Sequence, residues 1–385
     1  MKIVTEFPRR VREIENCWIP LRDGCRLAAR IWLPEDAEGD PVPAILEYIP
    51  YHKRSFTRGR DEPMHAYFAG HGYAAVRVDM RGSGESDGLL HDEYLQQEQD
   101  DALDVIAWLA RQPWCTGKVG MMGKSWGGFN ALQVAARRPP ALGAIITVCS
   151  TDDRYADDIH YMGGCLLNDN LWWGSVMLAL QGRPPDPAIV GDGWRRTWLE
   201  RLETMPFFPA LWLEHQRRDA YWRHGSVCED FSAIAVPVYA VGGWADGYSN
   251  AVARLLAGLS VPRKGLIGPW AHLYPHDGVP APAIGFLQEA LRWWDHWLKG
   301  RSTGIMDEPM LRVWMEDSLP PAATIPKRPG RWVTEDGWPS ARSKPLSLAL
   351  NPGRLDATPA SETALTIGSP QTVGAAAGRR PPGAR

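Results

Sequence analysis

The feature that most constrains the fold of this chain is the run VGMMGKSWGG at residues 119–128. An apolar stretch leads into a Gly-x-Ser-x-Gly turn, and an amphipathic segment at residues 129–136 follows it. A strand that turns sharply into a helix, with glycines on both sides of the serine, is typical of a nucleophile elbow. Such an elbow exposes the hydroxyl of Ser125 and places the N–H of Trp126 where an oxyanion would form. The same pentapeptide also occurs as an incidental glycine-rich turn, so the prediction depends on a histidine and an acid farther along the chain.

Strand and helix patterns alternate on both sides of this turn. Apolar runs at residues 44–49, 73–79 and 144–149 are typical of buried strands, and residues 93–114 carry a helical pattern between them. Two alternating runs within residues 11–34 flank an Asp-Gly pair, which indicates a hairpin. The alternation predicts a mostly parallel sheet with helices on both faces, and the elbow makes it an α/β-hydrolase fold.

The alternation stops at Ser150, and the following stretch is rich in Trp, Asp, Arg and Gly without a clear strand. A helical insertion of this length is expected to lie over the sheet as a lid. We therefore divide the chain into a first core part (1–150), a helical lid insertion (151–232), a second core part (233–304), the start of a β domain (305–370) and a disordered tail (371–385).

Bulk properties argue against several classes of function. The net charge is −3 at pH 7, which gives no basis for binding nucleic acid or an anionic membrane. No window reaches about 18 uninterrupted apolar residues, and the first ten residues lack the apolar core of a signal peptide. The six cysteines form no C-x-x-C pair and no Cys/His cluster with metal-ligand spacing. We expect a cytoplasmic protein with reduced thiols, no metal and no cofactor, whose association into homo-oligomers stays open.

An acid and a histidine follow the next two predicted strands. Asp246 comes after the strand pattern at residues 236–241 and a Gly-Gly turn, and His272 follows the pattern at residues 264–268. Functional groups of an open α/β sheet gather at the carboxyl ends of the strands, and the order Ser, Asp, His along the chain is that of α/β-hydrolases. In this triad Ser125 attacks, His272 transfers protons and Asp246 orients the imidazole.

Other residues compete for the roles of base and acid. The alternative bases are His160, His215, His224 and His276. His272 is favoured because it directly follows the last predicted strand before the C-terminal helix. The alternative acids are Asp152, Asp153, Asp157 and Asp158. They precede the insertion, too early for the third member of the triad, so we expect them to cap or brace the lid.

The assembled motifs resemble the CocE/NonD family of serine hydrolases, which includes X-Pro dipeptidyl-peptidases, cocaine esterase and α-amino ester hydrolases. The matching blocks are PY at 50–51, DMRGSGES at 79–86, GKSWGG at 123–128, GWAD at 243–246 and GPWAH at 268–272. The resemblance implies the triad Ser125, Asp246 and His272. It also implies that the hydroxyl of Tyr51 completes the oxyanion hole beside the backbone N–H of Trp126. From the residues alone, Tyr51 only ends a strand, and a packed tyrosine is an equal alternative.

The sequence departs from the family pattern in two places. Family members usually continue into a C-terminal β jelly-roll, whereas this sequence runs into an Arg/Pro/Gly-rich end, so we expect a truncated β domain. α-Amino ester hydrolases place acidic residues just after the triad acid, where this chain has residues 247–249, Gly-Tyr-Ser. This second departure weakens the α-amino ester assignment.

We expect a serine hydrolase that cleaves a small-molecule ester, amide or short peptide through an acyl-enzyme intermediate. The alternative within this class is an X-Pro dipeptidyl-peptidase, which needs a site for the free amine of its substrate. Asp157 and Asp158 are the candidates for that site. The alternative from another class is an inactive truncated remnant with at most a binding role.

Overall fold

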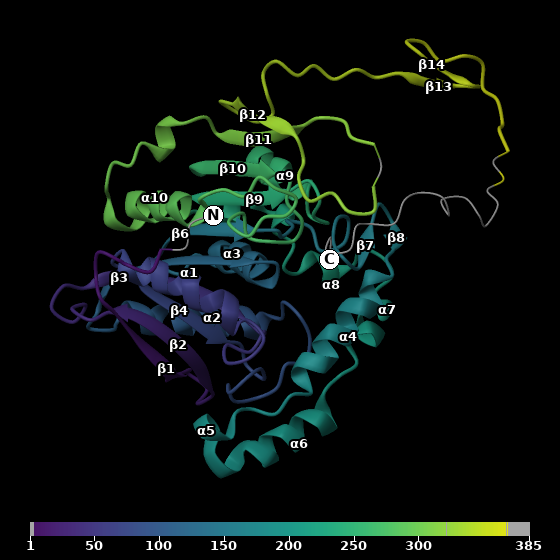
Figure 1. Ribbon diagram of the computed structural model, residues 1–385. Helices are drawn as coiled ribbons and strands as arrows, with labels where there is room; N and C mark the ends of the chain where they lie inside the picture. Colours follow the sequence, from purple (N-terminus) through teal and green to yellow (C-terminus); the bar gives the residue numbers. More distant parts are fainter. Residues whose placement is uncertain (1–3, 321, 367, 369–385) are drawn as a thin grey trace.

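A computed structural model describes residues 4–320, 322–366 and 368 of the chain. A ten-stranded sheet forms its centre, in the order β1-β2-β4-β3-β5-β6-β9-β10-β11-β12 (Figure 1). The strands are β1 (Val11–Pro20), β2 (Arg26–Pro34), β3 (Val42–Ile49), β4 (Ala74–Asp79), β5 (Cys115–Lys124), β6 (Leu142–Val148), β9 (Val238–Gly243), β10 (Arg263–Gly268), β11 (Leu311–Glu316) and β12 (Gly330–Glu335). All neighbours from β4 to β11 are parallel, and β1, β2 and β12 pair antiparallel. This arrangement confirms the expected α/β-hydrolase fold.

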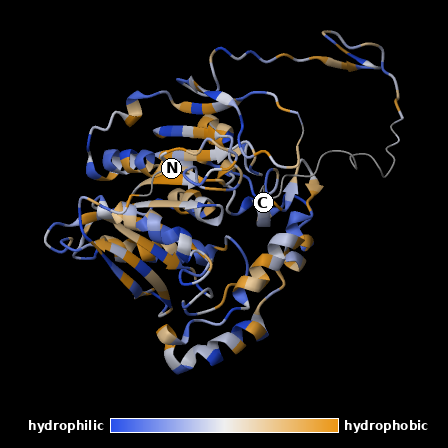
Figure 2. Ribbon diagram, in the orientation of Figure 1, coloured by the Kyte–Doolittle hydropathy of each residue, from blue (hydrophilic) through white to orange (hydrophobic). Residues whose placement is uncertain are grey.

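Helices cover both faces of the sheet because its inner strands are apolar on both sides. Successive side chains of a strand point to opposite faces, so neighbours on β3 and β5 enter different cores. Ile45 and Met122 pack with α1 (Arg58–Gly70) and α10 (Phe286–Lys299). Leu46 and Met121 pack with the helices of the opposite face. Those helices are α2 (Gln96–Ala110), α3 (Trp126–Ala136) and α9 (Ala251–Gly258). Figure 2 shows the hydrophobic residues along the central strands that these two layers enclose.

A mainly helical segment connects β6 to β9 and extends along one side of the sheet (Figure 1). Its helices are α4 (Asp169–Gln181), α5 (Pro187–Val190), α6 (Trp194–Thr204), α7 (Phe208–Glu214) and α8 (Ala220–Arg223). It also holds a short hairpin of β7 (Tyr161–Met162) and β8 (Cys165–Leu166), which the sequence pattern did not predict. The helices of this segment lie within the insertion predicted at residues 151–232.

Polar side chains fasten this helical segment to the loops that follow β4. The buried Arg201 of α6 donates to the carbonyl oxygens of Gly84 (2.8 Å) and Ser86 (2.5 Å). The carboxylate of Asp92 accepts hydrogen bonds from the Trp212 indole (3.0 Å) and the Tyr221 hydroxyl (2.6 Å). These hydrogen bonds add to the packing of buried side chains such as Met177, Trp212 and Trp222 of these helices against the core.

The C-terminal part differs from the expectation of a separate β domain from residue 305. After α10 the chain returns as β11, which lies parallel to β10, and β12 then pairs with β11 in the central sheet. The strand–helix–strand alternation thus continues for one more crossover, because α10 returns the chain to the open edge of β10. The hairpin of β13 (Ala349–Asn351) and β14 (Arg354–Asp356) stands away from the core, together with the segment that leads to it from β12 (Figure 1).

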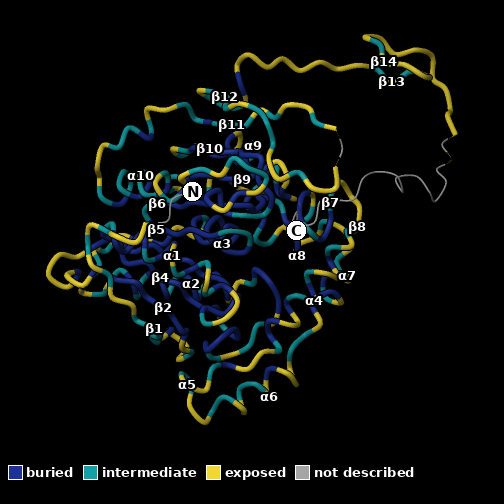
Figure 3. The backbone as a smooth tube through the Cα atoms, viewed as in Figure 1, coloured by how far each residue is buried: buried dark blue, intermediate teal, exposed yellow. Residues whose placement is uncertain are grey.

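This distal hairpin is exposed on both faces (Figure 3). The tail predicted to be disordered, residues 371–385, lies outside the described residues. Among the helices that the structure describes, none combines the length and the apolar character needed to cross a bilayer.

Candidate active site

Ser125 sits on a strained turn between β5 and α3. Its backbone angles are φ 59° and ψ −124°, a region that costs a residue with a side chain of order 1–3 kcal/mol. The turn is so tight that a Cβ on Gly123 would lie 2.5 Å from the Cα of Gly127. The backbone N–H of Ser125 donates to the carbonyl of Val148 (2.9 Å), which ties the turn to the neighbouring strand. The sequence at 123–128 therefore adopts the geometry of a nucleophile elbow.

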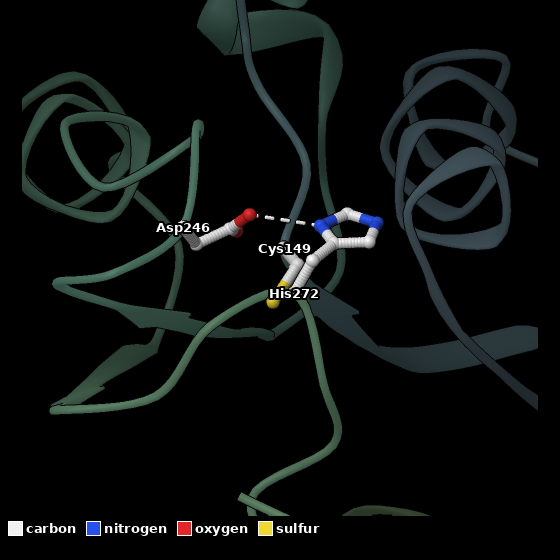
Figure 4. Close-up of side chains that lie close together, drawn as sticks. All are labelled: Cys149, Asp246 and His272. Atoms are coloured by element: carbon white, nitrogen blue, oxygen red, sulfur yellow. Dashed lines mark hydrogen bonds and ion pairs between the residues drawn. The ribbon is translucent and has the colours of Figure 1, made fainter. Parts of the chain in front are cut away.

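Asp246 and His272, here called the acid–base pair, meet at the carboxyl ends of β9 and β10. His272 Nδ1 lies 2.8 Å from Asp246 Oδ1 (Figure 4). The side chain of Asp246 is 2% exposed and that of His272 is 22% exposed. Burial by itself would raise the pKa of Asp246, but the contact with His272 lowers it below its ordinary value. An ionised Asp246 holds the proton of His272 on Nδ1 and leaves Nε2 as the proton acceptor.

The loop that carries His272 is fastened to the elbow through Lys124. The ammonium group of Lys124, the residue before Ser125, donates to the backbone carbonyl of His272 (2.9 Å). Within the described residues, the hydroxyl of Ser125 makes no hydrogen bond to His272. Catalytic hydrogen bonds of this kind often tighten only when a substrate is bound.

Tyr51 follows β3, and its ring packs edge-on against the ring of Trp126, the residue after Ser125, with 6.3 Å between the ring centroids. Burial raises the pKa of Tyr51, so its hydroxyl stays protonated and can donate to an anion. Trp126 is the first residue of α3, and the first N–H groups of a helix have no partner within the helix. The Tyr51 hydroxyl and the Trp126 N–H are thus two candidate donors near Ser125.

The competing histidines all have other partners. His160 lies between Glu93 and Asn170, His215 contacts Asp219, His224 contacts the carbonyl of Tyr94, and His276 faces Asp277.

The competing acids brace neighbouring loops: Asp152 and Asp157 pair with Arg254, Asp153 accepts from the backbone of Tyr155 and Ala156, and Asp158 accepts from the Tyr248 hydroxyl. The two candidates chosen by their position after a strand are the two that meet.

Cys149 is the residue of this site that sequence reasoning missed. It directly follows β6, in the left-handed region with φ 49°. Its sulfur, a carboxylate oxygen of Asp246 and a ring nitrogen of His272 all lie within 4.8 Å of one another (Figure 4). Sequence patterns of metal ligands consist of closely spaced residues, whereas these three are far apart along the chain. The signal that could have found Cys149 is the one used for Asp246 and His272, a reactive side chain directly after a parallel strand.

A second cluster of potential ligands lies beneath α1. Glu47, Asp61 and His65 are buried there with their donor atoms close together. Arg60 contacts both Glu47 (2.6 Å) and Asp61, and Arg77 lies 3.3 Å from Asp61. These guanidinium groups already neutralise the two carboxylates, so this cluster does not favour a cation.

Comparisons with known proteins agree with this geometry. Residues 23–274 match the model of the family described as X-Pro dipeptidyl-peptidase (S15 family). Cocaine esterase of Rhodococcus sp. is 30% identical over 335 residues, which cover 78% of this chain and 57% of that protein. Proteins of Mycobacterium bovis and Mycobacterium tuberculosis are 28% identical over 86% of this chain. The chain spans between 57% and 62% of the length of these three relatives.

Solved structures support the fold. A CocE/NonD family hydrolase from Staphylococcus aureus matches with a TM-score of 0.68 at 18% identity, over 90% of this chain and 60% of that chain. An α-amino acid ester hydrolase matches with a TM-score of 0.64 at 21% identity, over 94% of this chain and 66% of that chain. The predicted resemblance to the CocE/NonD family is confirmed.

Proposed function

This chain belongs to the X-Pro dipeptidyl-peptidase (S15) family, and on that premise we propose that it is a serine hydrolase acting through an acyl-enzyme. Its substrate is a small-molecule ester or amide. The observation that carries the proposal is the acid–base pair, with its 2.8 Å contact, whose His272 loop is hydrogen-bonded to the residue before a serine on a strained turn. A structural ion pair would not need a neighbouring serine in the left-handed region.

The first half of the reaction forms the acyl-enzyme. The hydroxyl oxygen of Ser125 attacks the substrate carbonyl while Nε2 of His272 takes its proton. The oxyanion that forms accepts hydrogen bonds from the Tyr51 hydroxyl and the Trp126 N–H. His272 then gives its proton to the leaving alcohol or amine, and Asp246 stabilises the imidazolium in between.

The second half releases the acid. Water enters the place of the leaving group, His272 takes one of its protons, and the oxygen attacks the acyl carbonyl. The same two donors stabilise the second oxyanion. Collapse of this intermediate breaks the bond to Ser125, which recovers its proton from His272.

Aromatic rings around Tyr51 favour a substrate with an apolar or aromatic group. Phe56, Trp126 and Trp173 each place a ring centroid between 6.1 and 6.3 Å from that of Tyr51. Phe56 is 60% exposed and Trp172, beside Trp173, is 41% exposed. Exposed rings at the edge of a site add contact area for an apolar ligand at little cost in conformational entropy.

One observation favours the dipeptidyl-peptidase alternative. Burial raises the pKa of Asp158 to about 7, and its Oδ2 is buried without a hydrogen-bond partner in the described chain. Its other oxygen accepts from the Tyr248 hydroxyl, and the Tyr248 ring lies 5.8 Å from the ring of His272. An ammonium group bound near Asp158 would ionise it. Asp157 is a weaker candidate because Arg254 already pairs with it at 2.7 Å.

The test is covalent labelling of the purified chain with a fluorophosphonate probe, with mass spectrometry to locate the adduct. We expect one adduct on Ser125, which is absent from Ser125→Ala and lost in His272→Ala. Hydrolysis of p-nitrophenyl esters and X-Pro anilides then separates the esterase from the peptidase. A folded chain that takes no label would overturn the proposal and leave a remnant with a binding role. The six free cysteines fit a cytoplasmic setting, which we propose for this activity.

A further inference from the structure

Three different donor atoms converge at the acid–base pair. They are the sulfur of Cys149, a carboxylate oxygen of Asp246 and Nδ1 of His272, all within 4.8 Å of one another (Figure 4). Each residue follows one of three adjacent parallel strands, β6, β9 and β10. The backbone N–H of Cys149 also donates to Val241 of β9 (2.9 Å). The sheet therefore fixes the spacing of the three donors.

The second carboxylate oxygen of Asp246, Oδ2, is available to bind a cation. In the part of the chain that the structure describes, no N–H or O–H group donates to Asp246 Oδ2, although it is buried. The sulfur of Cys149 lies within 4.8 Å of a carboxylate oxygen of Asp246 and 3.8 Å from the carbonyl oxygen of Leu273, to which the thiol donates. A buried carboxylate oxygen without a partner is costly. It can be stabilised by a cation that binds the carboxylate and the sulfur together.

We propose that Cys149, Asp246 and His272 form an inhibitory site for Zn²⁺. Sulfur, imidazole nitrogen and carboxylate oxygen are the three ligand types that Zn²⁺ binds in proteins, and a fourth position can take water. One thiolate and one carboxylate neutralise the two charges of the ion, so the ion and its three ligands together carry no net charge. The contact of 2.8 Å between His272 and Asp246 opens slightly when both bind one ion.

Binding of the ion displaces two protons from their places. The thiol of Cys149 releases its proton to solvent as the Zn–S bond forms. Nδ1 of His272 exchanges its proton for the ion, and the imidazole proton moves to Nε2. An imidazole with a proton on Nε2 cannot accept the proton of Ser125, so catalysis stops. This inhibition rests on the proposed function, whereas binding of the ion does not.

Cobalt binding tests the site without reference to activity. Co²⁺ occupies zinc sites and gives a thiolate-to-metal charge-transfer band in the near ultraviolet. We expect one equivalent of Co²⁺ to produce this band in the full chain and Zn²⁺ or EDTA to abolish it. The band is lost in Cys149→Ala and kept in Cys165→Ala, a matched control at an exposed cysteine. Cys149→Ser, which keeps nearly the same volume, replaces the alanine variant if that protein does not fold.

Inhibition is measured in parallel by ester hydrolysis with increasing Zn²⁺. We expect the wild type and Cys165→Ala to lose activity reversibly, and Cys149→Ala to tolerate at least tenfold more Zn²⁺ relative to its own metal-free rate. No cobalt band, or a band unchanged by substitution of Cys149, overturns the proposal. If the metal-free chain hydrolyses nothing, the proposed function fails, and the cobalt titration still decides the metal site.

Discussion

Two buried clusters in this molecule contain the same residue types but differ in their surroundings. Beneath α1, Glu47 and His65 are fully buried, with 3.2 Å between them, and arginines neutralise the carboxylates. At the carboxyl edge of the sheet, Asp246 and His272 are 2.8 Å apart, have no arginine partner among the described residues, and leave the imidazole partly exposed. A histidine and a carboxylate in contact therefore do not identify an active site. The free face of the imidazole and the strained serine beside it do.

The largest expected effect is that of removing the nucleophile. Ser125→Ala should lower kcat by about 10⁶-fold, because a triad acts as a unit. The chain should keep its stability or gain some, since alanine removes no packing contact. Steady-state hydrolysis of p-nitrophenyl esters measures kcat, and thermal unfolding measures stability. A variant that retains more than a hundredth of the wild-type rate would place the nucleophile elsewhere.

Removing the acid of the acid–base pair should give the second largest loss of activity. Asp246→Asn should lower kcat by about 10⁴-fold with little change in KM, because the amide no longer holds the Nδ1–H tautomer of His272. The readout is kcat and KM for the same ester, with circular dichroism to verify folding. Asp157→Asn, at an acid paired with Arg254, is the matched control and should stay near the wild-type rate. Equal losses in both variants would contradict the assignment.

Tyr51→Phe removes one of the two oxyanion donors and keeps the ring packing. We expect kcat to fall by about 10²–10³-fold and KM to change little, because the hydrogen bond strengthens only in the transition state. The measurement is the determination of kcat and KM separately for the wild type and for Tyr51→Phe. A rise in KM with kcat unchanged would assign Tyr51 to substrate binding alone.

A substitution in the cluster beneath α1 should lower stability and leave activity nearly unchanged, the opposite of the three variants above. Glu47→Gln removes one of the two carboxylates that pair with Arg60, and breaking the pair of the buried Glu47 should cost about 3 kcal/mol of stability. Glutamine still offers an acceptor to the Tyr274 hydroxyl, 3.1 Å from Glu47, so the nearby His272 loop is retained. Urea unfolding should show the loss of stability, while kcat per folded molecule stays within about threefold of the wild type. A large drop in kcat with unchanged stability would show that this cluster takes part in the reaction.

Lowering the pH should reduce the contribution of Glu47 in the same cluster to the free energy of unfolding. Burial alone would raise the pKa of Glu47, but Arg60, His65 and Arg77 hold it at about 2, below its ordinary value of 4.5. A lowered pKa stabilises the fold above pH 4.5, and the contribution of about 3 kcal/mol is lost as the pH falls from 4.5 towards 2. Urea unfolding at a series of pH values should therefore show the wild type and Glu47→Gln converging in acid. A constant difference between them would contradict the lowered pKa.

Much of the fold could be predicted because its signals are local. The serine between glycines specifies its own turn, and continuous apolar runs specify buried parallel strands. Asp246 and His272 were chosen because each follows a predicted strand. The structure brings these two side chains together, since residues after adjacent parallel strands meet at one edge of the sheet. The addition of β11 and β12 to the central sheet was missed, because the family resemblance led to the expectation of a separate β domain from residue 305.

By itself, the sequence determined the order of the elements, the elbow at Ser125 and the two residues that pair at the sheet edge. These features depend on patterns spanning a few residues or on the rule that parallel strands share one end. Only the tertiary structure decided that Cys149 contacts the acid–base pair and that arginines neutralise the cluster beneath α1. Such contacts join atoms far apart in the chain, and their distances are set by the register and packing of whole strands and helices.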